Sequence, residues 1–300
     1  MILHSNFGDL YDARVTKIFA DTYDNPVPES MIPVLFGMET SKRAYEIYSS
    51  IGSFKSWTKQ SKGLSVNYQD FYQGYDVTFT PDEYADGYKV ERKLIDDDMW
   101  NQVENRTKGF AIAGSATQEE IAAYVLNAAF TSTVTGGDAV CLCNSTHPTP
   151  NPAGSSQGNA GTTALSATSV EATRQLGYAI LDDAGKKAGV RYDMLIVPRG
   201  LEQTAWEIIN STGKVDTANN NKNFHYGKYQ LVVWDYLSDA NNWFMADSRL
   251  LKMALHFINR LPMEFERDKD FDSKARKYSG YMRNKAGFSE WRPVYGHAVS

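Results

Sequence analysis

The sequence is poor in cysteine, in long apolar runs and in the short motifs of common catalytic sites. Two cysteines in 300 residues are too few for a disulfide framework, which favours a reducing cytoplasm as the compartment. No run of about 18 or more apolar residues occurs, so no membrane span is expected. The first residues lack the basic and then apolar pattern of a secretory signal. HExxH, GxSxG, GxGxxG and phosphate-loop patterns are absent too, which argues against enzyme classes defined by a motif.

Charge is unevenly distributed along the chain. The net charge of −5 excludes a global attraction to nucleic acid. Residues 1–30 are acidic and residues 274–292 are basic. The acids are Asp9, Asp12, Asp21, Asp24 and Glu29, and the bases are Lys274, Arg276, Lys277, Arg283, Lys285 and Arg292. We expect these bases to pair with acids on a neighbouring copy; contact with DNA phosphates is the alternative.

Three consecutive aspartates, Asp96, Asp97 and Asp98, form the first candidate site. Adjacent helical positions do not face one another, so three in a row cannot converge on one ion without a special loop. Aspartate is a preferred N-cap, and acids near a helix N-terminus complement its dipole. We therefore interpret the three aspartates as a helix start rather than a metal or acid–base site.

A second candidate combines Cys141, Cys143 and His147. Zinc needs four ligands, and paired cysteines usually have two to four residues between them rather than one. Two buried or half-buried thiols are the favoured interpretation. The remaining histidines, which are His4, His225, His256 and His297, are scattered. No catalytic residue, cofactor-binding residue or metal ligand is predicted.

Periodicity and turn signals predict a mixed, α+β fold. Helices are expected near 6–20, at 38–50, over 97–131 and at 169–184, the last with a capping box of Thr168 and Glu171. Residues 56–95 are expected to form a long hairpin or irregular β-loop with a tight turn at Asp86-Gly87. A strand, a proline turn and a helix follow within 192–211, then a hairpin that turns at 238–242, then strands over 255–300. Residues 144–169 contain no acid, lysine or arginine and are expected to form a loop.

This order of parts resembles the major capsid proteins of tailed bacteriophages with the Hong Kong 97 type fold, and more specifically the Mu-type major head subunit family. The stretches that carry the resemblance are "NFGDLYDARV", "YKVERKLIDDDMW", "GGDAVCLCNSTHP", "GTTALSATSVEATRQLGYAILDDAGKKAG", "YDMLIVPRGLEQTAWEII" and "ARKYSGYMRNKAGFSEWRPVYG", in this order. None is catalytic or diagnostic alone, and together they cover nearly the whole chain.

The resemblance implies a division of the chain. Residues 1–45 would be an N-terminal arm, and 55–95 an extended loop (E-loop) that lies over an adjacent subunit. Residues 96–190 and 255–300 would form a peripheral (P) domain, whose spine helix spans 97–131 and begins at Asp96–Asp98. Residues 191–254 would be an axial (A) domain that clusters around the five- and six-fold axes.

The implied function is structural, without enzymatic activity. Copies would assemble into pentamers and hexamers that form an icosahedral shell around double-stranded DNA, which they contact non-specifically. Assembly would occur in the bacterial cytoplasm with a separate scaffold or protease, a portal and decoration proteins, without membrane contact. An encapsulin-like nanocompartment would instead hold cargo enzyme. A cytoplasmic hydrolase with its site in the 144–169 loop would form a small oligomer with a convergent nucleophile and base.

Replacing Asp96, Asp97 and Asp98 together by asparagine tests the helix-start interpretation. We expect a modest loss of stability or assembly, because asparagine also caps helices. Urea denaturation with and without a chelator measures it. A large loss that depends on metal would support an ion site instead.

Overall fold

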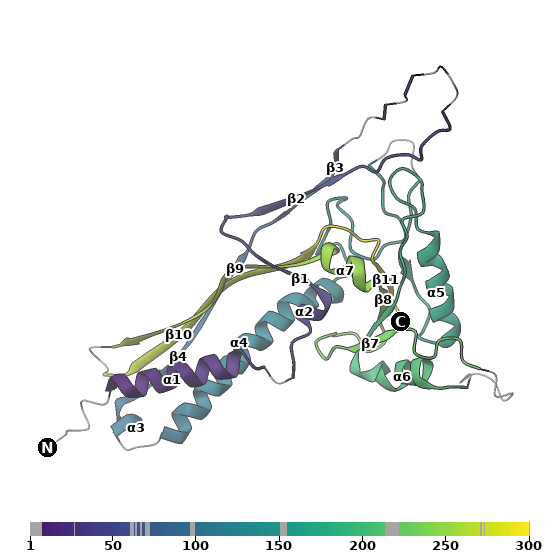
Figure 1. The fold of residues 1–300 in the computed structure, drawn as a ribbon. Helices are drawn as coiled ribbons and strands as arrows, with labels where there is room; N and C mark the ends of the chain where they lie inside the picture. Colours follow the sequence, from purple (N-terminus) through teal and green to yellow (C-terminus); the bar gives the residue numbers. More distant parts are fainter. Residues whose placement is uncertain are drawn as a thin grey trace.

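Long strands and one long helix give the molecule an elongated shape with a narrow end and a wide end (Figure 1). The computed structural model describes residues 8–26, 28–60, 63, 65–66, 68–69, 73–96, 100–150, 155–213, 222–270, 272 and 274–299. Within them the strands form a four-stranded sheet, a five-stranded sheet and a two-stranded ribbon. This combination of helices and sheets is the mixed α+β fold that the sequence predicts.

The four-stranded sheet runs from the middle of the molecule to the narrow end. β9 (Leu255–Lys269) and β10 (Arg276–Phe288) form its central antiparallel pair. β4 (Asp82–Val90) pairs with β10, and β1 (Gly37–Thr40) lies parallel to β9. Helices α1 (Gly8–Tyr23) and α4 (Trp100–Asn127) lie side by side along this sheet (Figure 1), with the short α3 (Arg92–Asp96) between β4 and α4 in the chain.

Helix α4 carries a stripe of buried residues that fits the 3.6-residue period. Val103, Thr107, Ala111 and Gly114 are buried at spacings of three or four residues. At Gly114 the helix approaches β9 closely, because a Cβ there would come within 2.6 Å of the Met263 sulfur and the Met263 side chain would have to shift. The helix therefore lies directly against the sheet at this point.

The narrow end has only a small apolar cluster, which stacked rings extend. The ring of Phe265 lies 4.3 Å from that of Phe19 and 5.7 Å from that of Tyr278, and Tyr88 stacks on Tyr278 at 5.0 Å. Such pairs contribute about 0.5–1.5 kcal/mol each beyond the area they bury. Rings from α1, β4, β9 and β10 thus join elements that are far apart in the sequence.

The wide end contains most of the core, which surrounds the five-stranded sheet. Its strand order is β5 (Ala160–Gly161), β11 (Val294–His297), β8 (Trp243–Ala246), β6 (Met194–Val197), β7 (Gln230–Val233). Every residue of β6, β8 and β11 is buried. The helices α5 (Ala167–Ala179) and α6 (Glu202–Asn210) lie at this end, and α2 (Ile32–Leu35) and α7 (Ser248–Ala254) lie nearer the middle (Figure 1).

The third element is a two-stranded ribbon of β2 (Glu46–Ile51) and β3 (Gln73–Phe79), which projects from the body (Figure 1). We call these strands and residues 52–72 between them the ribbon, and its described residues 52–60, 63, 65–66 and 68–69 the tip. No other strand pairs with β2 or β3 within the described residues.

Several sequence predictions are confirmed. A helix covers most of 97–131, although α4 begins at Trp100 and ends at Asn127. The helix predicted near 6–20 is α1, and the strand, proline turn and helix within 192–211 are β6, Pro198 and α6. Most of 144–169 that is described lacks regular structure, and strands dominate 255–300.

In the part of the chain that the structure covers, no helix has the length and hydropathy of a membrane span.

Several predictions of local structure are wrong. Residues 38–50 form β1 and β2 rather than a helix, because pairing with β9 and β3 overrides helix propensity. Asp86-Gly87 lies inside β4, opposite Gly280 and Ser279, rather than at a turn. β3 does not form a hairpin with β4, because β3 pairs with β2 and β4 pairs with β10. β7 does not pair with β8 either, because β6 lies between these two strands. The capping box of α5 consists of Ser166 and Ser169 rather than Thr168 and Glu171, and the helix ends at Ala179.

His297 joins α5 to the five-stranded sheet and makes the stability of this end depend on pH. Its ring stacks on Trp243 at 4.1 Å, and its Nε2 lies 2.8 Å from the Thr173 hydroxyl. Burial lowers the pKa of His297 from 6.5 to about 4. Between these values the unfolded chain binds the proton more strongly, so the stabilisation is present above pH 6.5 and is lost as the pH falls towards 4.

We therefore expect the melting temperature to fall between pH 6.5 and pH 4 less steeply for His297→Gln than for the wild type. Scanning calorimetry across this range measures both slopes, with pH 7.5 as the reference for each protein. Identical slopes would contradict the assignment.

Candidate functional site

The ribbon exposes more large apolar side chains than any comparable segment of the described chain. Trp57 is 95% exposed and Tyr68 is 88% exposed. The other exposed apolar residues of the ribbon are Ile47, Ile51, Phe54 and Val66. A two-stranded ribbon with this surface is marginal in water by itself. Exposed apolar surface of this kind marks a contact with another molecule.

The root of the ribbon is fixed to the body. Tyr48 on β2 stacks on His256 at 4.2 Å, packs edge-on against Phe79 at 5.4 Å, and donates its hydroxyl hydrogen bond to Glu39. His256 is held in turn by Glu39 at 2.9 Å and by Ser289 at 2.7 Å. Burial, followed by the carboxylate of Glu39, raises the pKa of Tyr48, so this hydroxyl remains a donor. The ribbon therefore has a rigid base.

A side-chain amide joins the two sides of the tip by hydrogen bonds. The side chain of Gln69 accepts a hydrogen bond from the Lys55 backbone N–H at 2.8 Å and donates to the Lys55 carbonyl at 3.2 Å. This amide bridge ties the two limbs together across 14 residues. The exposed aromatic side chains are thus presented on a closed loop.

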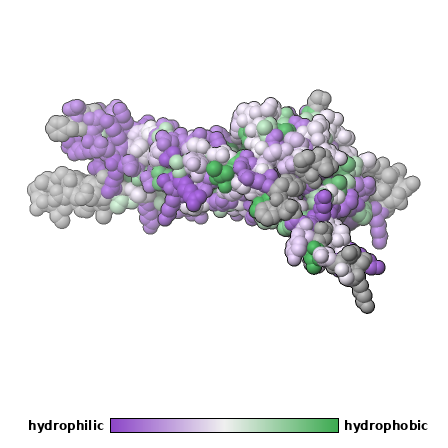
Figure 2. Space-filling model, turned by 90° about the horizontal axis from the view of Figure 1, so that it is seen from above, coloured by the Kyte–Doolittle hydropathy of each residue, from purple (hydrophilic) through white to green (hydrophobic). Residues whose placement is uncertain are grey.

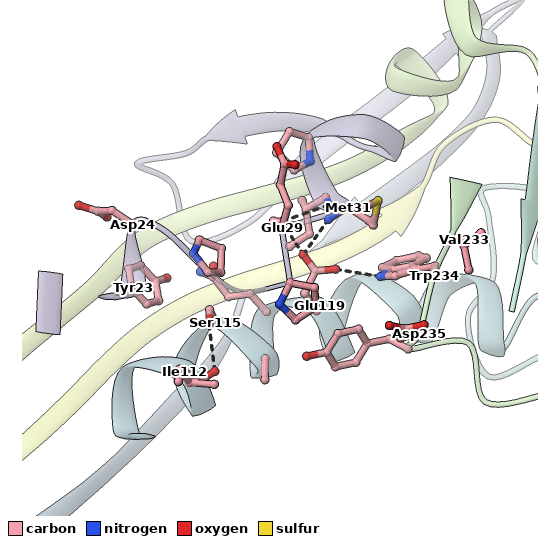
Figure 3. Close-up of a pocket in the computed structure, with 18 of the residues that line it drawn as sticks. Tyr23, Asp24, Glu29, Met31, Ile112, Ser115, Glu119, Val233, Trp234 and Asp235 are labelled. Carbon is pink, nitrogen blue, oxygen red and sulfur yellow. Dashed lines mark hydrogen bonds between the residues drawn. The ribbon is translucent and has the colours of Figure 1, made fainter. Parts of the chain in front are cut away.

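A pocket of about 310 Å³ lies between the arm, α4 and the end of β7 (Figure 3). We call it the arm groove. Glu119 of α4 forms its floor and is 7% exposed. Its Oε1 accepts hydrogen bonds from the Ser30 hydroxyl and from the Met31 N–H, the latter at 3.1 Å, and its Oε2 accepts one from Trp234 Nε1 at 2.9 Å. One carboxylate thus fastens the arm and the five-stranded sheet to α4.

The structure describes only part of the candidate residues from the sequence analysis. Asp96 ends α3, whereas Asp97 and Asp98 lie outside the described residues, so the helix-start interpretation stays a prediction. Cys141 and Cys143 are free and buried, as expected, and burial raises the pKa of Cys143. Within the described residues, no group of three or more His, Cys, Asp or Glu side chains is placed to hold a metal ion.

His147 fastens a loop. Its Nδ1 lies 2.6 Å from Asp138, its Nε2 lies 3.0 Å from the Asn159 side-chain oxygen, and its ring stacks on Trp291 at 4.3 Å. The Asn159 amide nitrogen donates to the carbonyls of Leu142 and Val294, both at 2.8 Å. This cluster joins the loop that follows α4 to the C-terminal strand, which is a structural role.

The basic segment near the C-terminus pairs largely within the chain. Lys277 binds Asp270 at 2.8 Å, and Lys285 binds Asp82 at 2.8 Å. Arg283 lies 3.4 Å from Glu83, and Arg292 lies 2.5 Å from Asp183. For these four bases the expectation of partners on a neighbouring copy is wrong, because β10 and the residues after it lie against acidic neighbours of their own chain.

Hydropathy separates the two ends of the molecule. In Figure 2 hydrophilic residues cover most of the narrow end, whereas hydrophobic residues are visible mainly in the middle and at the wide end. The sequence analysis predicted an extended loop at 55–95 but did not single out the exposed side chains of the tip or the buried Glu119. A signal for the tip was present, since residues 47–69 contain several aromatic residues and lysines but no acid.

The comparisons with known proteins agree with one another. The model of a phage capsid protein family matches residues 74–296. The mature capsid of bacteriophage PhiM1 is similar in structure, with a TM-score of 0.60 and 10% identity over 91% of this chain and 87% of that one. The decorated capsid of bacteriophage JBD30 has a TM-score of 0.56 and 15% identity over 70% and 91% of the two chains.

A virus-like particle from Pyrococcus furiosus has a TM-score of 0.52 and 7% identity over 95% of this chain and 98% of that one. No curated protein has a significantly similar sequence. At these identities the structural neighbours show the fold, which is of the Hong Kong 97 type.

Replacing Glu119 by alanine should destabilise the chain by roughly 3 kcal/mol, because the part-buried N–H of Met31 and the buried indole N–H of Trp234 lose their acceptor. Glu119→Gln should cost less, since its side-chain oxygen still accepts. The neighbouring Glu120 is exposed, so Glu120→Ala is the matched control and should change stability by less than about 0.5 kcal/mol. Urea denaturation followed by tryptophan fluorescence compares the three. Equal values for Glu119→Ala and Glu120→Ala would refute the role of Glu119.

Proposed function

The chain belongs to the phage capsid protein family, and from this premise we propose how it builds a shell. It is a structural major capsid protein with a Hong Kong 97 type fold. The proposed assembly consists of pentamers and hexamers in an icosahedral shell that encloses double-stranded DNA. The Mu-type subfamily is part of the proposal, and it rests on the ordered sequence stretches alone.

The observation that carries the proposal is the ribbon. Its tip exposes Phe54, Trp57 and Tyr68, whereas its root is fixed at Tyr48. A surface of this kind on a rigid base is suited to burial against a second copy, and repetition around a closed ring gives each copy the same contact. The ribbon is therefore proposed as the E-loop that lies over an adjacent subunit.

The division into domains is proposed with revised limits. We place the E-loop at residues 46–79 rather than 55–95, because β4 pairs along its whole length with β10. The P domain would contain the four-stranded sheet with α1 and α4 as spine. The A domain, expected at 191–254, would also include β5 and β11, because these strands complete the five-stranded sheet.

The partners of the shell are proposed from the family resemblance. They are a separate scaffold or protease, a portal and decoration proteins, with assembly in the cytoplasm of the bacterial host. No enzymatic activity is proposed. The buried histidines and cysteines of the described chain are engaged in packing and hydrogen bonding that fasten the fold.

Replacing Phe54, Trp57 and Tyr68 together by serine should weaken shell formation strongly without unfolding the subunit. Each buried large apolar side chain contributes about 1.5–3 kcal/mol to a contact, so the concentration at which shells appear should rise by at least about tenfold. Negative-stain electron microscopy over a concentration series, with and without a co-expressed scaffold, measures this onset.

The matched control changes Ser53, Ser56 and Thr58 of the same tip to alanine, and shells should form as in the wild type. Circular dichroism checks that both variants keep the fold, since the root residues are untouched. Normal shells from the serine variant would refute the E-loop assignment. A wild-type protein that stays monomeric or dimeric under all conditions would refute the capsid assembly itself.

A further inference from the structure

The arm groove carries a negative charge at its rim. Asp24 and Glu29 both line it and are exposed, and neither has an ion-pair partner within the described residues. The arginine of the groove, Arg199, is already bound to Asp235 at 2.8 Å and to Glu202 at 3.0 Å. The carboxylate of Glu119 on the floor is engaged by three donors. Two carboxylates at the rim are therefore available to an incoming cation.

The walls of the groove are apolar. They include Pro26, Pro28, Met38 and Ile112, with Ile112 47% exposed on the outer side of α4. Figure 3 shows Ile112 on α4 beneath the arm residues and Trp234 at the far end of the pocket. A volume of about 310 Å³ is at the lower end of the range for small-ligand pockets, so a single large side chain fits it better than a whole element.

The tip has the complementary character. Trp57 is the most exposed large apolar residue of the described chain, and Lys55 and Lys59 stand two residues before and after it. Neither lysine has an ion-pair partner within the described residues, and no acid occurs from residue 47 to residue 69. An aromatic side chain between two cations thus matches an apolar pocket with two carboxylates at its rim.

We propose that the ribbon tip of one copy docks in the arm groove of a second copy. Trp57 enters between the arm and α4, and Lys55 and Lys59 face Asp24 and Glu29. This inference rests on the proposed shell assembly and adds the receptor for the tip. The partner is a second copy because the ribbon projects from one side of its own chain, whereas α2 and the end of α1, which border the groove, lie across the four-stranded sheet (Figure 1).

The contact is heterologous, since each copy offers one tip and one groove. Heterologous contacts close into rings when the rotation between copies permits it. The arm that lines the groove is fastened by Glu119, so the receptor is formed before a neighbour arrives.

Photo-cross-linking tests the proposal directly. Trp57→p-benzoylphenylalanine keeps a large aromatic group at the tip and forms covalent bonds with the C–H groups it contacts. Shells assembled from an equal mixture of this variant and isotope-labelled wild type are irradiated, digested and analysed by mass spectrometry. We expect cross-links between chains to peptides that contain residues 23–38, 112–119 or 233–236.

The matched control is Trp206→p-benzoylphenylalanine on α6, which is 56% exposed and lies outside the groove. It should not label these peptides. Tip cross-links to other segments, or none from shells that do form, would overturn the docking while leaving the capsid function intact. Failure of the wild type to form shells would instead count against the assembly.

Charge reversal decides the matter if the photoreactive variant does not assemble. Lys55→Glu with Lys59→Glu should raise the onset concentration about tenfold or more, because like charges then face each other across the contact. Adding Asp24→Lys and Glu29→Lys to the same chain should restore the onset to within about threefold of the wild type, since opposite charges face again. The same tip reversal combined with Glu91→Lys and Glu266→Lys, two exposed acids outside the groove, should not. Rescue by the second pair rather than the first would overturn the proposal.

Discussion

The buried carboxylate of Glu119 is the constraint on which the position of the ribbon depends. It holds Ser30 and Met31 of the arm to α4, and α2 follows at once with Ile32 and Leu35 in the core. The next segment, β1, can then add to the edge of β9 and place Glu39 beside His256 and Tyr48. Each contact positions the next segment, so an interaction in the C-terminal third of α4 sets the direction of an element that begins at residue 46.

The same chain of contacts explains why the ribbon is stable without a core of its own. Its root is stabilised by stacked rings and by hydrogen bonds to Glu39, whereas its tip is closed only by the Gln69 amide. Rigidity at one end and exposed apolar surface at the other lower the entropic cost of binding, because the direction of the tip is set before contact. Burial of the exposed apolar side chains of the tip on assembly would add to the stability of the ribbon.

Sequence reasoning succeeded where the signal is local. The period of α4, the loop before α5 and the strand, proline turn and helix around Pro198 all follow from neighbouring residues. It failed where pairing partners are distant. Asp86-Gly87 has the composition of a turn, yet it lies in a strand because β10, about 190 positions later, pairs with it. Residues 38–50 form strands for the same reason.

The candidate site was harder to predict from the sequence than the fold. Nothing in "TQEEIAAY" distinguishes Glu119 from Glu120, because both are acids on one helix and only the arm and Trp234 make one of them a buried acceptor. The tip was more accessible to prediction, since an acid-free stretch with lysines around a tryptophan is visible in the sequence alone. Its meaning still required the structure, which places this stretch on a projecting ribbon.

The distribution of satisfied and unsatisfied groups separates the interior from the assembly surface. In the interior, hydrogen-bonding and stacking partners surround His147, His256 and His297. These side chains, of a type common in catalytic sites, therefore stabilise the fold here. The assembly surface is different. Trp57 at the tip is exposed, and within the described chain there is no ion-pair partner for Lys55 and Lys59 of the tip or for Asp24 and Glu29 of the arm groove. Because the two sets are complementary and lie on different sides of one molecule, the proposed head-to-tail contact would use two neighbours, one that accepts the tip and one that fills the groove. The fold thus completes its interactions between chains rather than within one.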